Sequence, residues 1–119
     1  MLILIAEDEL IISKAYERFL TKNGFEVKCF KNGNLLLDFL KLNQMLPFVM
    51  MLDMQLNSAL TGMDIAKEVR KTLSTPIIFV TGNSEQKVKD EIQTVNNAHV
   101  LIKPVDYNEL LRLLGSLSG

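Results

Sequence analysis

The chain has only one cysteine, no basic block and no long hydrophobic run, and each shortage excludes a class of protein. Cys29 alone cannot form an intramolecular disulfide, so nothing supports an oxidising compartment, and we expect a half-buried strand residue there. The 13 Lys and Arg residues are interspersed with 14 Asp and Glu residues, for a net charge of -1, which argues against direct nucleic-acid binding. No apolar run reaches the roughly 18 residues of a membrane span, and Glu7 comes too early for a signal peptide. We therefore expect a cytoplasmic protein without a membrane partner.

The 119 residues are the length of one domain, and we expect a single domain over residues 1–119. Short apolar runs alternate with longer segments of helical period, which is typical of βαβ units and a parallel sheet. The runs predict strands over residues 2–6, 25–29, 48–52, 77–80 and 100–102. Right-handed crossovers then favour an α/β fold with one doubly wound, five-stranded parallel sheet in the flavodoxin-like order 2-1-3-4-5, together with five helices.

The segments between these strands predict the helices. The first has two apolar rows at a spacing of four residues, which together predict one wide apolar stripe: Ile11, Ala15 and Phe19, and Ile12, Tyr16 and Leu20. Asn23-Gly24 should end this helix, because glycine adopts the left-handed conformation of a helix terminus without steric cost. The helix around 84–96 has the fewest apolar residues and should be the most loosely anchored, whereas Asp106 should cap a leucine-rich helix over 106–117.

Charged and hydroxyl side chains follow four of the predicted strands. Glu7-Asp8 ends the first apolar run, Asp53 ends the third, and Thr81 and Lys103 end the fourth and fifth. Because ligands bind at the carboxyl edge of such sheets, we expect these groups to share one site. Three close carboxylates resist joint ionisation unless a cation joins them, and oxygen ligands without a His/Cys cluster favour Mg²⁺ over zinc.

In this order, the acidic pair, the strand-end Asp, the Thr and the Lys-Pro pair resemble the receiver domain of two-component response regulators over nearly the whole chain. The resemblance implies that Asp53 accepts a phosphoryl group and that Thr81 and Lys103 contact its oxygens. It further implies that the main-chain carbonyl of Gln55 joins the metal ligands and that a cis Lys103-Pro104 bond directs the lysine into the site. It implies no enzymatic activity beyond self-phosphorylation and self-dephosphorylation.

The same resemblance implies the partners. The phosphoryl donor would be a histidine kinase or a histidine phosphotransfer protein. A downstream effector would bind the face formed by the helix around 84–96, the strand over 100–102 and the helix over 106–117. A closely balanced element biased by a local change of charge is how such switches work.

Several positions depart from the family pattern. Val100 stands where an aromatic residue usually rotates, and we expect its neighbour His99 to be a surface residue. Asn57 takes a position that is often proline, and Gly62 comes late enough to predict a lengthened loop. Together with Gln55, Asn83 is expected to flank the path of an attacking water.

Other interpretations stay open at this point. A phosphorylation-independent interaction domain on the same fold is supported only by Val100. An FMN carrier would need a Ser/Thr/Gly-rich phosphate loop after the first strand, where Glu7-Asp8-Glu9 would repel phosphate. A dedicated Mg²⁺-dependent phosphohydrolase would need a second Asp where the chain has Leu10.

Overall fold

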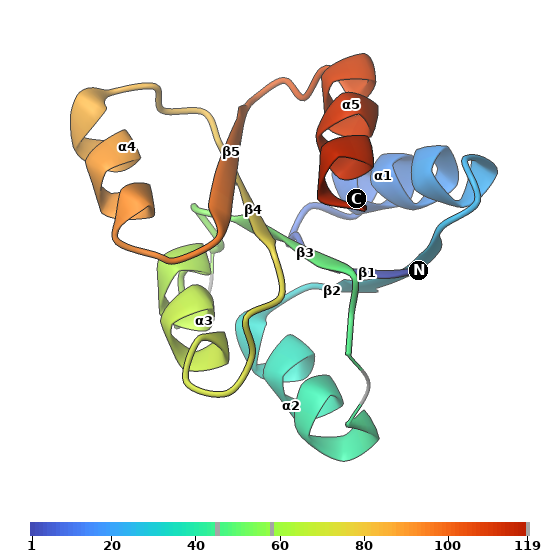
Figure 1. Cartoon of the computed structure of the whole chain (residues 1–119), viewed down its shortest axis with the longest axis horizontal. Coiled ribbons are helices and arrows are strands. Elements are labelled where there is room, and N and C mark those ends of the chain that lie inside the picture. Colours follow the sequence, from blue (N-terminus) through green and yellow to red (C-terminus); the bar gives the residue numbers. More distant parts are fainter. Residues whose placement is uncertain (45, 58, 119) are drawn as a thin grey trace.

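A sheet of five parallel strands forms the centre of the computed structural model, which describes residues 1–44, 46–57 and 59–118 (Figure 1). The strands are β1 (Leu2–Ala6), β2 (Glu26–Phe30), β3 (Val49–Asp53), β4 (Ile77–Thr81) and β5 (Ala98–Ile102). They lie in the order β2-β1-β3-β4-β5 and every neighbouring pair is parallel. The predicted flavodoxin-like topology is confirmed.

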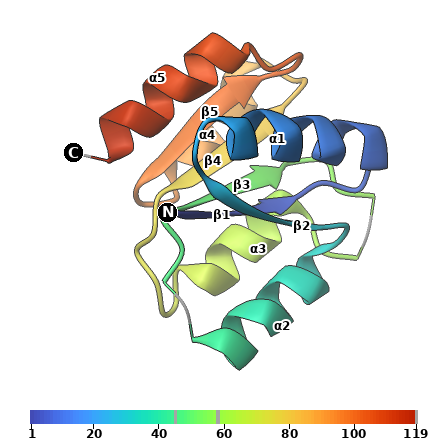
Figure 2. The same ribbon diagram turned by 90° about the vertical axis from the view of Figure 1, so that its right-hand side faces the viewer.

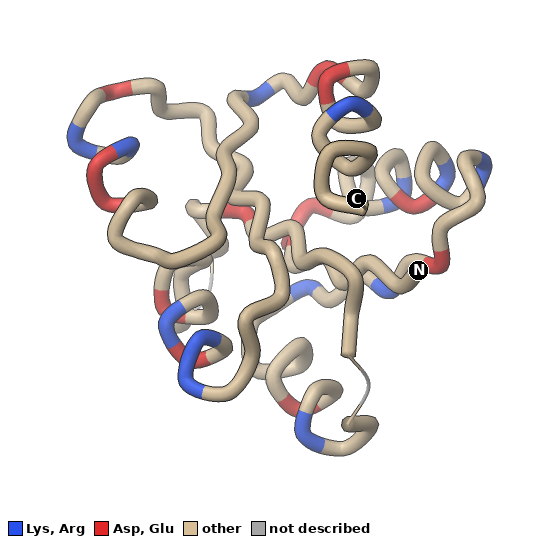
Figure 3. The backbone as a smooth tube through the Cα atoms, in the orientation of Figure 1, with Lys and Arg blue, Asp and Glu red and all other residues tan. Residues whose placement is uncertain are grey.

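Five helices cover the two faces of this sheet. They are α1 (Leu10–Lys22), α2 (Gly33–Asn43), α3 (Gly62–Val69), α4 (Gln86–Gln93) and α5 (Tyr107–Leu117). Helices α1 and α5 pack on one face, and α2, α3 and α4 pack on the other (Figure 1); Figure 2 shows α1 and α5 above the sheet and α2 and α3 below it. Each helix carries residues of both charge signs (Figure 3), and no helix within the described residues combines the length and the apolarity that crossing a bilayer requires.

The three central strands are buried at every position because helices cover both of their faces. Their continuous apolar sequences meet this requirement without the alternation of a half-exposed strand. Side chains such as Ile3, Met51 and Phe79 have at most 1% of their surface exposed. Each contributes on the order of 2 kcal/mol by leaving water, so the central strands rigidly position the residues at their carboxyl ends.

Helix α1 buries a narrower face than the sequence predicts. Ile12 is partly buried and Tyr16 and Leu20 are buried, but Ile11 is 86% exposed and Ala15 is exposed. A helix against one face of a sheet buries an arc of about 100° of its circumference. Ile11 and Ala15 lie outside this arc, whereas Phe19 from the same row is partly buried and packs against the core. The predicted wide stripe is therefore wrong at Ile11 and Ala15 and confirmed at Phe19.

The predicted helix ends agree with the structure at two places. Helix α1 ends at Lys22, and Gly24 follows with a φ of 92°, which favours glycine. The Asp106 carboxylate accepts the main-chain N–H groups of Asn108 and Glu109 and so caps α5.

Helix α4 is shorter than the predicted 84–96 segment and begins without a side-chain cap. Ile92 is the one buried residue within it, Val95 is buried just beyond its end, and Val88 is partly buried. This sparse burial agrees with the prediction that α4 is loosely anchored.

Candidate functional site

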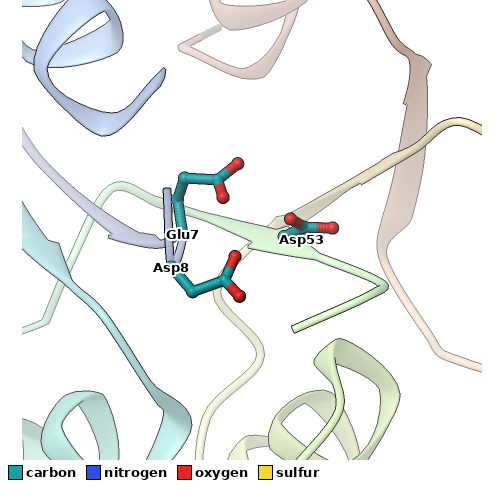
Figure 4. A group of neighbouring side chains, drawn as sticks. All are labelled: Glu7, Asp8 and Asp53. Carbon is teal, nitrogen blue, oxygen red and sulfur yellow. The ribbon is translucent and has the colours of Figure 1, made fainter. Parts of the chain in front are cut away.

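Three carboxylates gather at the carboxyl ends of β1 and β3. Glu7 and Asp8 directly follow β1, and Asp53 is the last residue of β3, which pairs with β1 up to the residue before it. One oxygen from each carboxylate lies within 4.8 Å of the other two (Figure 4). Glu7 and Asp53 are only 3% and 4% exposed, whereas Asp8 is partly exposed. The site is thus open to solvent at Asp8 and closed around the other two acids.

Lys103 brings a positive charge to this cluster from the end of β5. Its Nζ lies 3.0 Å from Asp53 Oδ2 and 4.0 Å from Glu7 Oε1. Burial lowers the pKa of Lys103, but its hydrogen bond to Asp53 and the negative charges of the neighbouring acids outweigh this effect and raise that pKa. The ammonium therefore stays charged, and the Lys103–Pro104 peptide bond is cis, as the resemblance implied.

Burial and neighbouring negative charge disfavour the ionised form of Glu7. Its Oε1 is buried without a hydrogen-bond partner among the described residues, while its Oε2 accepts the Glu9 N–H at 3.1 Å. Burial above all, followed by the charge of Asp53, raises the pKa of Glu7 to about 7. A buried carboxylate oxygen that accepts no hydrogen bond among the described residues, beside two further carboxylates, fits a hard divalent cation, which would favour the ionised form of Glu7.

Two loops bring polar groups beside Asp53. The Gln55 N–H donates to Asp53 Oδ1 at 2.9 Å. Thr81, which ends β4, is 1% exposed; its Oγ1 accepts the Asn83 N–H at 3.0 Å, and its carbonyl accepts the Lys103 N–H at 2.8 Å. Thr81 therefore shares a main-chain bond with Lys103. The metal role of the Gln55 carbonyl, the phosphoryl contact of Thr81 and the water path past Asn83 stay predictions.

The loop after Asp53 contributes two contacts that the sequence analysis did not predict. A Cβ at Gly62 would collide with the Asp53 carbonyl oxygen and lie 2.9 Å from its carbon, so only glycine allows α3 to approach the site this closely. The Asn57 N–H donates to Asp8 Oδ2 at 3.0 Å. The bond from Asn57 could not be predicted from residue type, because its donor is a main-chain N–H. The close approach at Gly62 has a signal in the sequence, namely a glycine at the start of a helix. Ser58 of this loop lies outside the described residues.

His99 and Val100 are neighbouring residues of β5. Val100 pairs with Phe79 and packs, partly buried, on the sheet face that α4 covers. His99 is only partly exposed, and its Nε2 is buried without a hydrogen-bond partner among the described residues. The expectation that His99 is a surface residue holds only in part, because β5 places it beside the buried strand β4.

Comparisons with known proteins show what the chain is similar to. A family model described as "Response regulator receiver domain" matches residues 3–115. The chain is 26% identical over 110 residues to the transcriptional regulatory protein CrdR of Helicobacter pylori, covering 91% of this chain and 50% of that protein. It is 25% identical over 118 residues to the probable transcriptional regulator ycf29 of Pyropia yezoensis, covering 97% of this chain and 52% of that protein. The chain thus spans about half the length of these curated relatives.

Solved structures are also similar. The receiver domain of the Francisella response regulator 1452 has a TM-score of 0.86 at 22% identity, with 98% of this chain and 94% of that chain covered. The chemotaxis protein CheY4 of Vibrio cholerae has a TM-score of 0.86 at 25% identity, with coverages of 98% and 97%.

Proposed function

The chain belongs to the response regulator receiver domain family, and we propose that it accepts a phosphoryl group on Asp53. Receiver domains are signalling modules and not classical enzymes. The observation that carries the proposal is the position of the Asp53 carboxylate, which lies within 4.8 Å of two other acids and 3.0 Å from the Lys103 ammonium. Phosphoryl transfer needs mainly positioned groups that neutralise the phosphoryl oxygens, and this arrangement meets that need.

In the proposed reaction, an oxygen of Asp53 attacks the phosphorus of a phosphohistidine on a histidine kinase or a histidine phosphotransfer protein. The new phosphorus–oxygen bond forms as the phosphorus–nitrogen bond breaks, and the imidazole leaves with the electron pair of that bond. Lys103 and the Thr81 hydroxyl would each contact one phosphoryl oxygen. The product is an aspartyl phosphate. Water later hydrolyses it, and Gln55 and Asn83 would flank the path by which that water approaches.

Glu7, Asp8, Asp53 and the main-chain carbonyl of Gln55 would hold Mg²⁺ in this site. Bound there, the ion would supply positive charge against the phosphoryl oxygens. Two features of the chain's own residues favour a cation: the clustered negative charge, and the oxygen of Glu7 that accepts no hydrogen bond among the described residues.

The phosphorylated site would act on the surface formed by α4, β5 and α5. Thr81 moves toward the new phosphoryl group and takes with it the loop that leads into α4. Because α4 buries so few side chains, a few kcal/mol of differential contact is enough to change its position. A downstream effector would bind this face. From the family alone we infer a cytoplasmic location.

Nuclear magnetic resonance with beryllofluoride and Mg²⁺ tests the proposal. Beryllofluoride mimics a phosphoryl group on a carboxylate, so wild-type amide signals near the site and in α4 should shift. The isosteric variant Asp53→Asn keeps the acceptor oxygen for Gln55 but should show no such shifts. A wild-type spectrum that does not change with beryllofluoride would contradict the proposal.

The missing ring at Val100 favours one alternative, a domain that binds its partner regardless of phosphorylation. Val100 is already packed against the core and has no aromatic side chain to rotate when Thr81 moves. Partner affinity measured with and without beryllofluoride separates the two functions, because equal affinities would favour the alternative.

A further inference from the structure

Each of the three clustered acids accepts one main-chain N–H in the described part of the chain. For Glu7 the donor is Glu9, and for Asp53 the donor is Gln55, each two residues further along. For Asp8 the donor is Asn57, which lies 49 residues away in the loop after β3. The first two bonds are local turns at strand ends, but the third joins two separate loops across the site.

We infer that the main-chain N–H of Asn57 is a positioning group for the metal site, because it fixes the carboxylate of Asp8. The inference rests on the proposed Mg²⁺-dependent function. Asp8 is the most exposed of the three acids and, within the described residues, forms no ion pair with Lys103, so its side chain is the one that packing restrains least. A charge-assisted hydrogen bond at 3.0 Å holds one oxygen of Asp8 and leaves the second without that constraint.

The residue type at position 57 allows this contact. Proline, which often occupies this position in the family, has no N–H and could not donate to Asp8. Asparagine restores the donor, and the side chain plays no part in the bond, since the main-chain nitrogen is the donor atom.

The contact also connects the loop to the ion. Groups that hydrogen-bond to a metal-ligating carboxylate orient it, and their removal typically weakens metal binding about 10-fold or more. Mg²⁺ demands near-ideal octahedral geometry and is sensitive to a misplaced ligand. Binding of the ion should in turn strengthen the contact between Asn57 and Asp8.

Two substitutions at one position separate the N–H from the side chain. Asn57→Pro removes the donor, whereas Asn57→Ala removes the side chain and keeps the donor. Mg²⁺ titrations followed by amide resonances should give a dissociation constant about 10-fold weaker for Asn57→Pro. The Asn57→Ala protein should stay within about twofold of wild type. Equal affinities for wild type and Asn57→Pro, or equal losses in both variants, would overturn the inference.

A second measurement decides the matter where Asn57→Pro does not fold. In wild type without Mg²⁺, the Asn57 amide proton should resonate downfield and exchange slowly, and in Asp8→Ala it should move upfield and exchange faster. An Asn57 amide that is the same in both proteins would refute the contact. Wild-type protein that binds no Mg²⁺ would overturn the proposed function and this inference together, whereas normal wild-type binding with an unaffected proline variant would overturn the inference alone.

Discussion

Replacing Glu7 by glutamine should stabilise the metal-free protein at alkaline pH. In wild type, Glu7 is 3% exposed and lies beside Asp8 and Asp53, and one of its oxygens has no hydrogen-bond partner among the described residues. Ionising this carboxyl in the fold is therefore costly. Glutamine has nearly the same shape, keeps an oxygen for the Glu9 N–H and carries no charge. Glu7→Gln thus removes the repulsion and leaves the packing in place.

The size and sign of the effect follow from the pKa of Glu7, which is about 7 in the fold against an ordinary value of 4.5. Between these values the folded protein binds more protons than the unfolded chain, so the free energy of unfolding falls as pH rises. The stabilising effect of the raised pKa is fully present below pH 4.5 and is lost by the time pH passes 7. At 1.36 kcal/mol per pH unit, the whole change is about 3 kcal/mol.

Urea unfolding in EDTA at a series of pH values measures this change. Wild type should lose about 3 kcal/mol relative to Glu7→Gln between pH 4.5 and pH 8. Glu26→Gln, at an exposed position, should stay within about 0.5 kcal/mol of wild type throughout. Adding Mg²⁺ at pH 8 should raise the stability of wild type more than that of Glu7→Gln. Parallel pH profiles for wild type and Glu7→Gln would refute the reasoning.

Two matched pairs test the structure around the site. Gly62→Ala should destabilise the fold by about 2 kcal/mol or more, because its Cβ would collide with the Asp53 carbonyl, whereas Gly115→Ala in an open position of α5 should be neutral or stabilise by about 0.5–1 kcal/mol. Urea unfolding checks both, and equal effects would contradict the contact. The Arg70 side chain donates to three main-chain carbonyls, two in the turn before β5 and one in the segment before β4. Arg70→Met should therefore lower the free energy of unfolding by about 1–3 kcal/mol and speed amide hydrogen exchange in the turn before β5. The exposed Arg112→Met is its control, and unchanged exchange in Arg70→Met would count against this anchor.

Much of the fold was predictable because its strands are short apolar runs that end in polar residues. The predicted strand over 48–52 differs from the observed β3 by one residue at each end, and the shift places Asp53 inside the strand. Parallel pairing then brings the strand ends to one edge, so the acids and Lys103 could be placed together from their order alone. Strand-end chemistry is visible in a sequence because it depends on residue type.

Other features depend on three-dimensional context that residue type does not carry. The bond from Asn57 to Asp8 uses a main-chain donor, and any residue except proline would have offered the same atom. The exposure of Ile11 depends on the rotation of α1 about its own axis. The sequence does not predict this rotation, because the helix has two equally apolar rows and either could face the sheet. The partial burial of His99 comes from its neighbours in space on β4, which its neighbours in sequence do not indicate.

The central claim is that Asp53 itself becomes phosphorylated. The most direct measurement is to incubate the protein with a small-molecule phosphodonor and Mg²⁺, reduce the acyl phosphate with borohydride, and locate the reduced residue by peptide mass spectrometry. The account predicts reduction at Asp53, and no reduction when Mg²⁺ is replaced by EDTA. Reduction at Glu7 or Asp8 instead, or none under any condition, would contradict it.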